Sequence, residues 1–264
     1  IILEGPKEHL DLTENTQPAI FLSSYVIFEM IRKESNLKLE GAKYFAGHSL
    51  GEYSALAASK SLDFTSAIKL LNERGKAMQT AVPKGAGGML AVLGIDIKEI
   101  NNLLEENKND YKCYIANDNS NGQVVLSGLN IDIDKFIDTL KVKKIKNIKL
   151  PVSAPFHCKL MDKATSIMKD KINNTNFKKP ENVIISNVTG AETQEIDKIK
   201  DLLIEQIESP VRWRESVIYM IENGVTNFIE IGPGKVLSGL VKRINKNVKI
   251  NTINDENDIK NLNI

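Results

Sequence analysis

The segment Gly47-His48-Ser49-Leu50-Gly51 matches the pattern G-x-S-x-G, in which the serine is typically a nucleophile. A short apolar segment, 43–46, precedes the motif, and a helix-forming stretch, 52–58, follows it. A serine on such a tight strand-to-helix turn exposes its Oγ at the helix N-terminus, where developing negative charge is stabilised. The pattern predicts Ser49 as a nucleophile and the Leu50 N–H as a donor to an oxyanion. The alternative is a plain Gly-rich turn in which Ser49 caps a helix.

A serine nucleophile needs a neighbouring base, and the sequence offers only three histidines, His9, His48 and His157. In a G-x-S-x-G turn, the side chain just before the serine usually points away from it, which argues against His48 as the base. His157 follows Pro155 in an irregular segment, and such segments often carry catalytic groups. We therefore predict His157 as the base; the alternative is a surface or helix-capping histidine.

Arg74 lies on the apolar face of a predicted helix, 65–82, together with Ala67, Leu71 and Met78. A guanidinium among apolar side chains is unfavourable unless an anion meets it. Two explanations remain open at this point. Either Arg74 forms an internal salt bridge, or it binds a substrate carboxylate through a bidentate pair of hydrogen bonds, which arginine can make and lysine cannot.

Several other kinds of site are excluded or disfavoured. The two cysteines, Cys113 and Cys158, are isolated and indicate a reducing, intracellular setting rather than a disulfide framework. The histidines show no zinc-binding spacing, so we expect no metal site. The segment 231–235 resembles a phosphate loop, but Ile229 and Val236 occupy positions that would need Gly and Ser or Thr.

The composition is that of a globular protein with no preference for nucleic acid or membranes. The 264 residues include 35 basic and 34 acidic side chains, so no overall positive field attracts nucleic acid. The longest apolar stretch, 19–31, is interrupted by Ser23, Ser24 and Glu29 and is too short to span a bilayer. It is predicted to be a buried helix.

The predicted elements indicate an α/β protein with an inserted subdomain. Within 85–150 we expect a β-α-β-β-α-β order, which is the ferredoxin-like arrangement, with strands 89–93, 112–116, 123–127 and 146–150 and helices 98–106 and 131–140. Gly- and Pro-rich stretches flank this unit, and 85–88 is interpreted as a connector. The remaining segments, 1–84 and 151–264, alternate helices and strands and predict a core with a mostly parallel sheet.

Four motifs, in order through the chain, together resemble the malonyl-CoA:acyl-carrier-protein transacylases of type II fatty acid synthesis. They are the segments 47–56 (GHSLGEYSAL), 74–79 (RGKAMQ), 151–158 (PVSAPFHC) and 230–237 (EIGPGKVL). The resemblance implies an α/β hydrolase-like core with a ferredoxin-like insertion, in agreement with the arrangement predicted above.

The resemblance also implies roles for individual residues. Ser49 is the nucleophile, His157 its base and Arg74 the binder of the malonyl carboxylate. Leu50 supplies an oxyanion N–H, and the backbone carbonyl of Gln206 orients the histidine. The remaining residues assigned to substrate binding are His48, Met78, Asn117 and Phe156. The bulk of Phe156 is expected to leave little room for an α-methyl group.

The implied reaction is a two-step transfer of malonyl from malonyl-CoA to the pantetheine thiol of acyl carrier protein, through a malonyl-serine, which supplies extender units for fatty acid synthesis. No cofactor is expected, and the protein is expected to be a monomer, in the cytoplasm or in an organelle that houses this pathway. A serine thioesterase or esterase on the same scaffold remains an alternative. So does a non-catalytic module that only binds the carrier protein.

One departure from the family pattern affects the oxyanion site. Family members open with a strand that ends in G-Q-G-S-Q, whose glutamine donates a second oxyanion N–H, and the 264 residues contain no such segment. The sequence therefore predicts that the chain begins partway into the family pattern. Loss of one oxyanion donor typically lowers the rate by about 10² to 10³.

Overall fold

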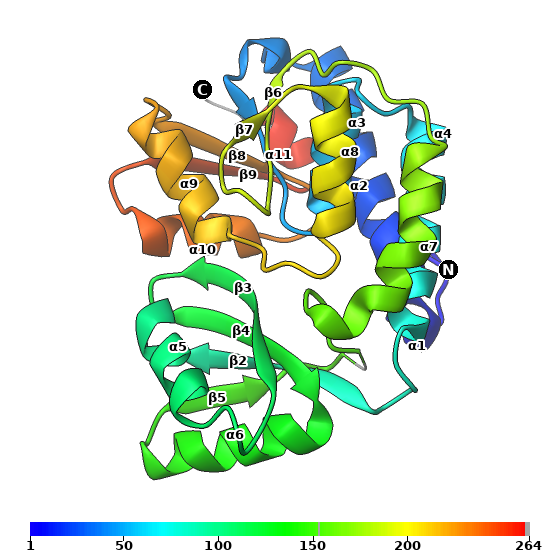
Figure 1. The fold of residues 1–264 in the computed structure, drawn as a ribbon. Helices are drawn as coiled ribbons and strands as arrows, with labels where there is room; N and C mark the ends of the chain where they lie inside the picture. Colours follow the sequence, from blue (N-terminus) through cyan, green and yellow to red (C-terminus); the bar gives the residue numbers. More distant parts are fainter. Residues whose placement is uncertain (153, 262–264) are drawn as a thin grey trace.

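The computed structural model describes residues 1–152 and 154–261, which form an α/β core and a smaller subdomain (Figure 1). Ser153, in the predicted irregular segment, lies outside the described residues. The core contains the helices α1 (Lys7–Leu10), α2 (Thr13–Glu34), α3 (Gly51–Ala58), α4 (Phe64–Thr80), α7 (Asp162–Asn173), α8 (Ile196–Glu205), α9 (Trp213–Glu222), α10 (Val236–Ile244) and α11 (Glu256–Lys260). Its strands are β1 (Tyr44–Phe45), β6 (Val183–Ile185), β7 (Glu192–Thr193), β8 (Asn227–Ile231) and β9 (Lys249–Ile253). The α/β class is confirmed.

The parallel strands of the core form two sheets. Strand β1 pairs in parallel with β6, which also carries the short antiparallel β7, and β8 pairs in parallel with β9. A cavity of about 650 Å³, lined by residues of both β1 and β8, lies between the two sheets. Within the described ranges, 1–152 and 154–261, β1 and β8 therefore each have one strand partner, and no ladder joins them.

Helix α4 forms as its sequence pattern predicts and buries a charged side chain. It begins after Asp63, whose carboxylate accepts the Ser66 N–H at 2.9 Å and so caps the first turn. Ala67, Leu71 and Met78 on its inner face are buried in the main core cluster. Arg74 lies on the same face and is only 1% exposed. The helix thus places a guanidinium inside the molecule.

The subdomain has the predicted β-α-β-β-α-β order. Its elements are β2 (Gly87–Leu93), α5 (Ile97–Glu106), β3 (Cys113–Ser120), β4 (Gln123–Leu129), α6 (Asn130–Val142) and β5 (Lys146–Lys149), and its antiparallel sheet has the strand order β3-β4-β2-β5. Leu90 and Val92 pack towards α5 and α6, whereas Met89 and Ala91 belong to a separate cluster on the opposite face. Phe156 packs against that second cluster, so this face of the sheet supports the segment that carries His157.

The connector before the subdomain is shorter than predicted, because Gly87 and Gly88 belong to strand β2. A Cβ on Gly87 would lie 2.3 Å from the Pro155 ring, so the ring packs directly onto the strand backbone. The glycine therefore allows a close approach between the strand and the segment before His157. The outer limits predicted for the subdomain, 85 and 150, stay predictions.

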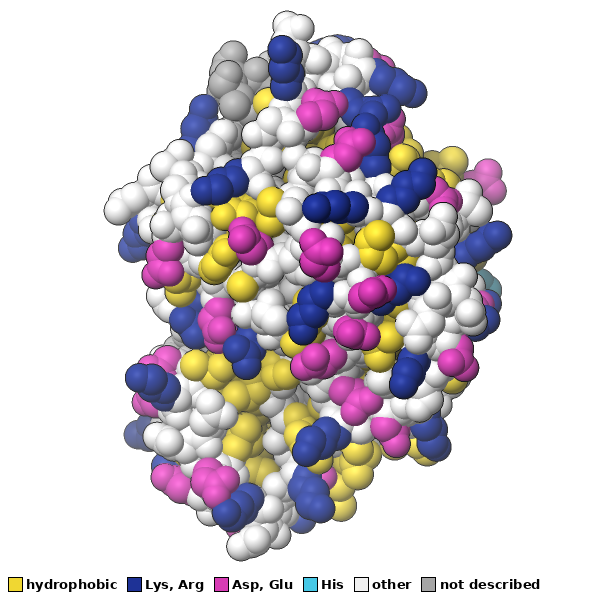
Figure 2. All heavy atoms as spheres, turned by 45° about the horizontal axis from the view of Figure 1, so that its top comes forward, with side chains coloured by type: hydrophobic (Ala, Val, Ile, Leu, Met, Phe, Trp, Pro, Cys, Tyr) yellow, Lys and Arg dark blue, Asp and Glu magenta, His cyan; other side chains and the backbone are white. Residues whose placement is uncertain are grey.

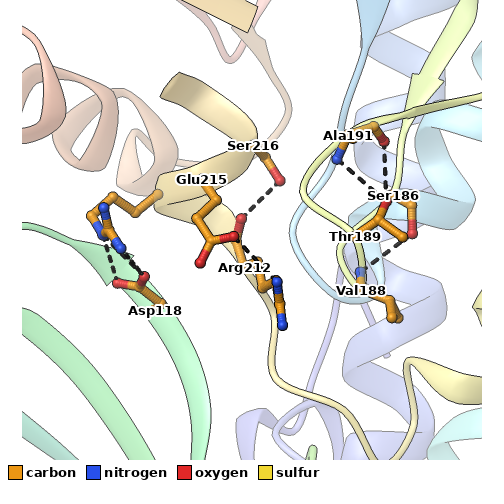
Figure 3. Close-up of polar contacts among 9 residues, drawn as sticks. Asp118, Ser186, Val188, Thr189, Ala191, Arg212, Glu215 and Ser216 are labelled. Atoms are coloured by element: carbon orange, nitrogen blue, oxygen red, sulfur yellow. Dashed lines mark hydrogen bonds and ion pairs between the residues drawn. The ribbon is translucent and has the colours of Figure 1, made fainter. Parts of the chain in front are cut away.

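Strand β3 is longer than predicted and joins the subdomain to the core. Its pairing with β4 shifts register around Asn117 and Asp118, and Asn117 forms an isolated parallel bridge with Val211 of the core. Asp118 reaches across to the core and accepts hydrogen bonds from Arg214 Nε and Nη2 at 2.7–3.1 Å (Figure 3). Asp118 is 2% exposed, so this bidentate ion pair is largely desolvated. The ion pair joins strand β3 of the subdomain to helix α9 of the core.

The surface shows no accumulation of one charge on the face drawn in Figure 2. Basic and acidic side chains are interspersed there, in keeping with a net charge of +1. Among the residues that the structure describes, no helix has the length and apolarity needed to cross a bilayer. The same described ranges hold no cluster of three or more metal-ligating side chains.

Candidate active site

The turn between β1 and α3 carries Ser49 in a strained backbone conformation. Ser49 has φ 52°, a left-handed value that non-glycine residues adopt rarely and mostly at functional sites. A Cβ on Gly47 would lie 2.0 Å from the Gly51 carbonyl oxygen, so only glycine fits there. A Cβ on Gly51 would meet open space, so the second glycine of the motif is not required by packing. Leu50 is the N-cap of α3, and the next three N–H groups bond to the carbonyl oxygens of residues 48–50.

Asn187 holds the turn on both sides of the serine. Its Oδ1 accepts the Ser49 N–H at 2.6 Å, and its Nδ2 donates to the Gly47 carbonyl oxygen at 2.8 Å. Asn187 is itself buried, in the loop that follows β6. These bonds satisfy backbone groups that a strained turn would otherwise leave without partners.

His157 contacts the hydroxyl of Ser49. Its Nε2 lies 2.8 Å from Ser49 Oγ, and its Nδ1 lies 2.8 Å from the backbone oxygen of Gln206. Because a carbonyl oxygen only accepts, Nδ1 carries the proton and Nε2 is free to accept from the serine. His157 is 4% exposed, which makes it neither a surface histidine nor a simple cap. Burial, and then the positive charge of Arg74, lower the pKa of His157 to about 3.

Arg74 lies beside the same hydroxyl. Its Nη2 donates to Ser49 Oγ at 3.0 Å and to Gln206 Oε1 at 2.9 Å, and its Nη1 donates to Gln17 Oε1 at 2.6 Å. Among the described residues, Arg74 does not form the internal salt bridge considered from the sequence. Its partners besides Ser49 are the side chains of Gln17 and Gln206, which are neutral amides. A buried cation that is held by amides, next to the Ser49 hydroxyl, is suited to bind an anionic group of a substrate.

Glu52 is a buried carboxylate directly beneath this turn. Burial raises its pKa to about 7, while hydrogen bonds from the Asn187 N–H and the Gln206 side chain, and the charge of Arg74, act in the opposite direction. Its Oε2 accepts from the Asn187 N–H at 3.1 Å and from Gln206 Nε2 at 2.7 Å. The carboxylate therefore belongs to the hydrogen-bond network that surrounds Ser49.

The subdomain supplies the other side of the site. Asn119 of β3 bonds to His48 through Oδ1 and Nε2 at 2.8 Å, and the His48 ring also lies 5.7 Å from that of Trp213. His48 is thus directed to the subdomain and α9, and its pKa is lowered by burial. Asn117 lies on the same strand, buried at the bridge with Val211.

Comparison with known proteins identifies the family. The sequence model of a family described as "Acyl transferase domain" matches residues 1–260. A malonyl CoA-acyl carrier protein transacylase of Bacillus subtilis is 41% identical over 264 residues, covering 98% of this chain and 81% of that protein. The corresponding protein of Escherichia coli is 37% identical over 253 residues, covering 96% and 81%.

The chain belongs to the malonyl CoA-acyl carrier protein transacylase family.

Solved structures of transacylases have the same fold. An acyl-carrier-protein-S-malonyltransferase from Bartonella henselae superposes with a TM-score of 0.94 at 39% identity, over 98% of this chain and 82% of that one. A malonyl-transacylase solved in complex with a type II PKS acyl-carrier protein gives a TM-score of 0.93 at 36% identity, over 97% and 82%. The fold that the sequence resemblance implied is therefore confirmed.

Two residues that the transacylase resemblance assigned to substrate binding lie at the edge of the site. Phe156 packs between the core and the subdomain sheet, immediately before His157. Met78 is buried in the core, and its Sδ lies 4.0 Å from Nε2 of Gln17, which holds Arg74. The roles of both in binding the substrate of this transacylase stay predictions.

Sequence reasoning missed three polar residues of the transacylase site: Gln17, Glu52 and Asn187. Glu52 carried a weak signal, since it is a charged side chain in a predicted helix rich in alanine, whereas Gln17 follows four polar residues and gave none. Asn187 carried none, because its loop lies 138 residues from Ser49 and only the fold brings them together.

We expect a His157→Gln variant of this transacylase to lose less stability on acidification than the unmodified protein. Folded, His157 stays neutral down to about pH 3, whereas an unfolded histidine binds a proton below about 6.5. As the pH falls through this window, the unfolded state takes up a proton that the folded state does not, and stability is lost. The free energy of unfolding should therefore fall more steeply with decreasing pH in the unmodified protein than in the variant, by up to about 1.4 kcal/mol per pH unit.

Urea unfolding of both proteins, followed from about pH 6.5 to about pH 4, measures the two slopes. His48 and Glu52 are present in both proteins, so their own titrations cancel in the comparison. Equal slopes would contradict the low pKa of His157.

Proposed function

We propose that this chain transfers a malonyl group from malonyl-CoA to the pantetheine thiol of an acyl carrier protein, through a malonyl ester of Ser49. The observation that carries the proposal is the position of the Ser49 hydroxyl between a neutral imidazole and a buried guanidinium, at 2.8 Å and 3.0 Å. The first activates the oxygen as a nucleophile, and the second fits an acyl group that ends in a carboxylate.

In the first half-reaction, Ser49 Oγ attacks the thioester carbon while its proton passes to His157 Nε2. The Leu50 N–H, at the N-terminus of α3, donates to the oxyanion that forms. The C–S bond then breaks, and the proton on His157 passes to the sulfur of the departing CoA. The Gln206 carbonyl holds the imidazole throughout and stabilises its charged form.

In the second half-reaction, the pantetheine thiol gives its proton to His157 and its sulfur attacks the malonyl-serine carbon. The ester bond breaks, and Oγ regains the proton. The carboxylate stays bound to Arg74 in both steps, in place of the hydrogen bond that Arg74 makes to Ser49 Oγ in the free protein. This contact between Arg74 and the carboxylate orients the acyl group and selects for malonyl over acyl groups that lack a carboxylate.

Family membership supports the identity of both substrates, since the relatives are named for transfer between CoA and acyl carrier protein and one was solved with its carrier protein. His48, Asn117 and Phe156 are proposed to line the acyl and pantetheine site between the core and β3. We further propose that the protein acts as a monomer, since one chain supplies every side chain that this mechanism uses.

The test is to measure CoA release from malonyl-CoA with and without the phosphopantetheine form of an acyl carrier protein. We expect sustained release, matched by malonyl-carrier protein, only when the carrier is present, and at most one equivalent of CoA without it. Sustained release without carrier would identify a thioesterase instead. Carrier binding with no CoA release in either case would identify a binding module.

A further inference from the structure

The side-chain amide of Gln206 is buried and fully used. It is 0% exposed, its Nε2 donates to Glu52 Oε2 at 2.7 Å and to the Ser49 carbonyl oxygen at 3.2 Å, and its Oε1 accepts from Arg74 Nη2 at 2.9 Å. Carboxylate and carbonyl oxygens only accept, and a guanidinium only donates. A single orientation of this amide satisfies all three neighbours.

Glu52 accepts hydrogen bonds from one side chain and one backbone N–H group of the site. It is 2% exposed in the first turn of α3, and its Oε2 receives both the Gln206 amide and the Asn187 N–H. Gln206 leads on to Arg74, and Asn187 leads on to the backbone of Ser49. A buried carboxylate is unfavourable unless hydrogen bonds compensate for its lost hydration. Here those bonds connect Glu52 both to Arg74, through Gln206, and to the Ser49 backbone, through Asn187.

We propose that Glu52 is a positioning residue of the transfer reaction, which fixes the orientation of the Gln206 amide so that its oxygen holds Arg74 beside Ser49. The inference rests on the proposed function, because the loss expected below is selective only if Arg74 binds a carboxylate of the acyl group. Without an acceptor at residue 52, the amide NH₂ group keeps only its longer bond to the Ser49 carbonyl oxygen, at 3.2 Å, so the orientation in which Oε1 faces Arg74 is held less firmly. In the rotated orientation two donors would face each other, and Arg74 would move away from Ser49.

The proposal predicts a selective loss. The histidine is oriented by the backbone carbonyl of Gln206, which no side-chain change removes. A disordered Arg74 therefore impairs binding of malonyl groups, while chemistry on an acetyl group, which has no carboxylate, depends on it much less. A general structural role for Glu52 would lower both reactions together.

The test compares Glu52→Met, which has no strong acceptor, with Glu52→Gln, whose side-chain oxygen can still accept both bonds. We measure kcat and KM for malonyl-CoA and acetyl-CoA with the same carrier protein at pH 8, above the pKa of Glu52. Glu52→Met should lower kcat/KM for malonyl-CoA about ten- to hundredfold, mainly through KM, and acetyl transfer far less. Glu52→Gln should restore most of the malonyl activity.

Gln206→Met is the second variant, and it keeps the test decisive if Glu52→Met does not fold. It should show the same preferential loss of malonyl transfer, and adding Glu52→Met to it should not change the malonyl-to-acetyl ratio further, because Glu52 acts through Gln206. Equal losses for both substrates in either variant, or additive effects on the ratio, would overturn the proposal. The unmodified protein is assayed first: absence of malonyl transfer there refutes the proposed function, not the role of Glu52.

Discussion

Replacing Ser49 by alanine is expected to abolish malonyl transfer, with a loss of rate on the order of 10⁶ and no covalent malonyl-protein. The substitution removes only Oγ. The backbone bonds that fix the turn, from the Ser49 N–H to Asn187 and from Gln206 to the Ser49 carbonyl, stay available. The defect should therefore be chemical, because Ser49 Oγ is the one hydroxyl that bonds to the His157 ring within residues 1–152 and 154–261.

Incubation of the intact protein with radioactive malonyl-CoA, followed by denaturation and counting, measures the covalent intermediate. Ser54→Ala is a matched control, because Ser54 lies on α3 one turn beyond the motif and has no part in the proposed mechanism. The control should be labelled as well as the unmodified protein. Label that persists on the Ser49 variant would show that another residue accepts the acyl group.

Replacing Arg74 by alanine is expected to change the substrate preference. Loss of a buried charge-assisted contact to a carboxylate amounts to about 2–5 kcal/mol, or roughly 30- to 5,000-fold in kcat/KM for malonyl-CoA. Acetyl-CoA makes no such contact, so acetyl transfer should fall much less. Arg74→Lys keeps the charge but not the planar fork held by Gln17 and Gln206, so it should recover only part of the loss.

Competing assays with malonyl-CoA and acetyl-CoA measure the ratio directly, and residual acetyl transfer shows that the variant is folded. Lys76→Ala is the matched control: Lys76 lies two residues further along α4, and its side chain is 52% exposed. It should leave the ratio unchanged. Equal losses for both acyl groups in Arg74→Ala would remove Arg74 as the carboxylate clamp.

The sequence carried most of the information about the fold and about the residues that surround the Ser49 hydroxyl. The strand-turn-helix around Ser49 and the alternation within the subdomain are local patterns, and local patterns can be read without knowing the fold. Arg74 could be identified because a permanently charged side chain on the apolar face of a helix is unfavourable unless a polar or anionic partner meets it. The short elements α1, β7 and α11 were missed, since two to five residues give too little periodicity to detect.

The hydrogen bonds that hold Ser49 and Arg74 in place could not be predicted. Glu52, Asn187 and Gln17 act through contacts with residues far away in the chain, and no local pattern specifies which carbonyl or guanidinium each will meet. The division of the parallel strands into two sheets was also missed. Strand residues show which face is buried, but they do not show which strand becomes the neighbour.

The cavity between β1 and β8 borders the turn that carries Ser49, since Gly47 and Leu50 line it. Among the described residues no backbone ladder crosses the cavity, so the two sheets meet there through side chains. Phe28 of α2 shares one cluster with Phe45 and Ile229, which come from the two sheets. On this side, the turn is therefore supported by side-chain packing and not by a strand ladder.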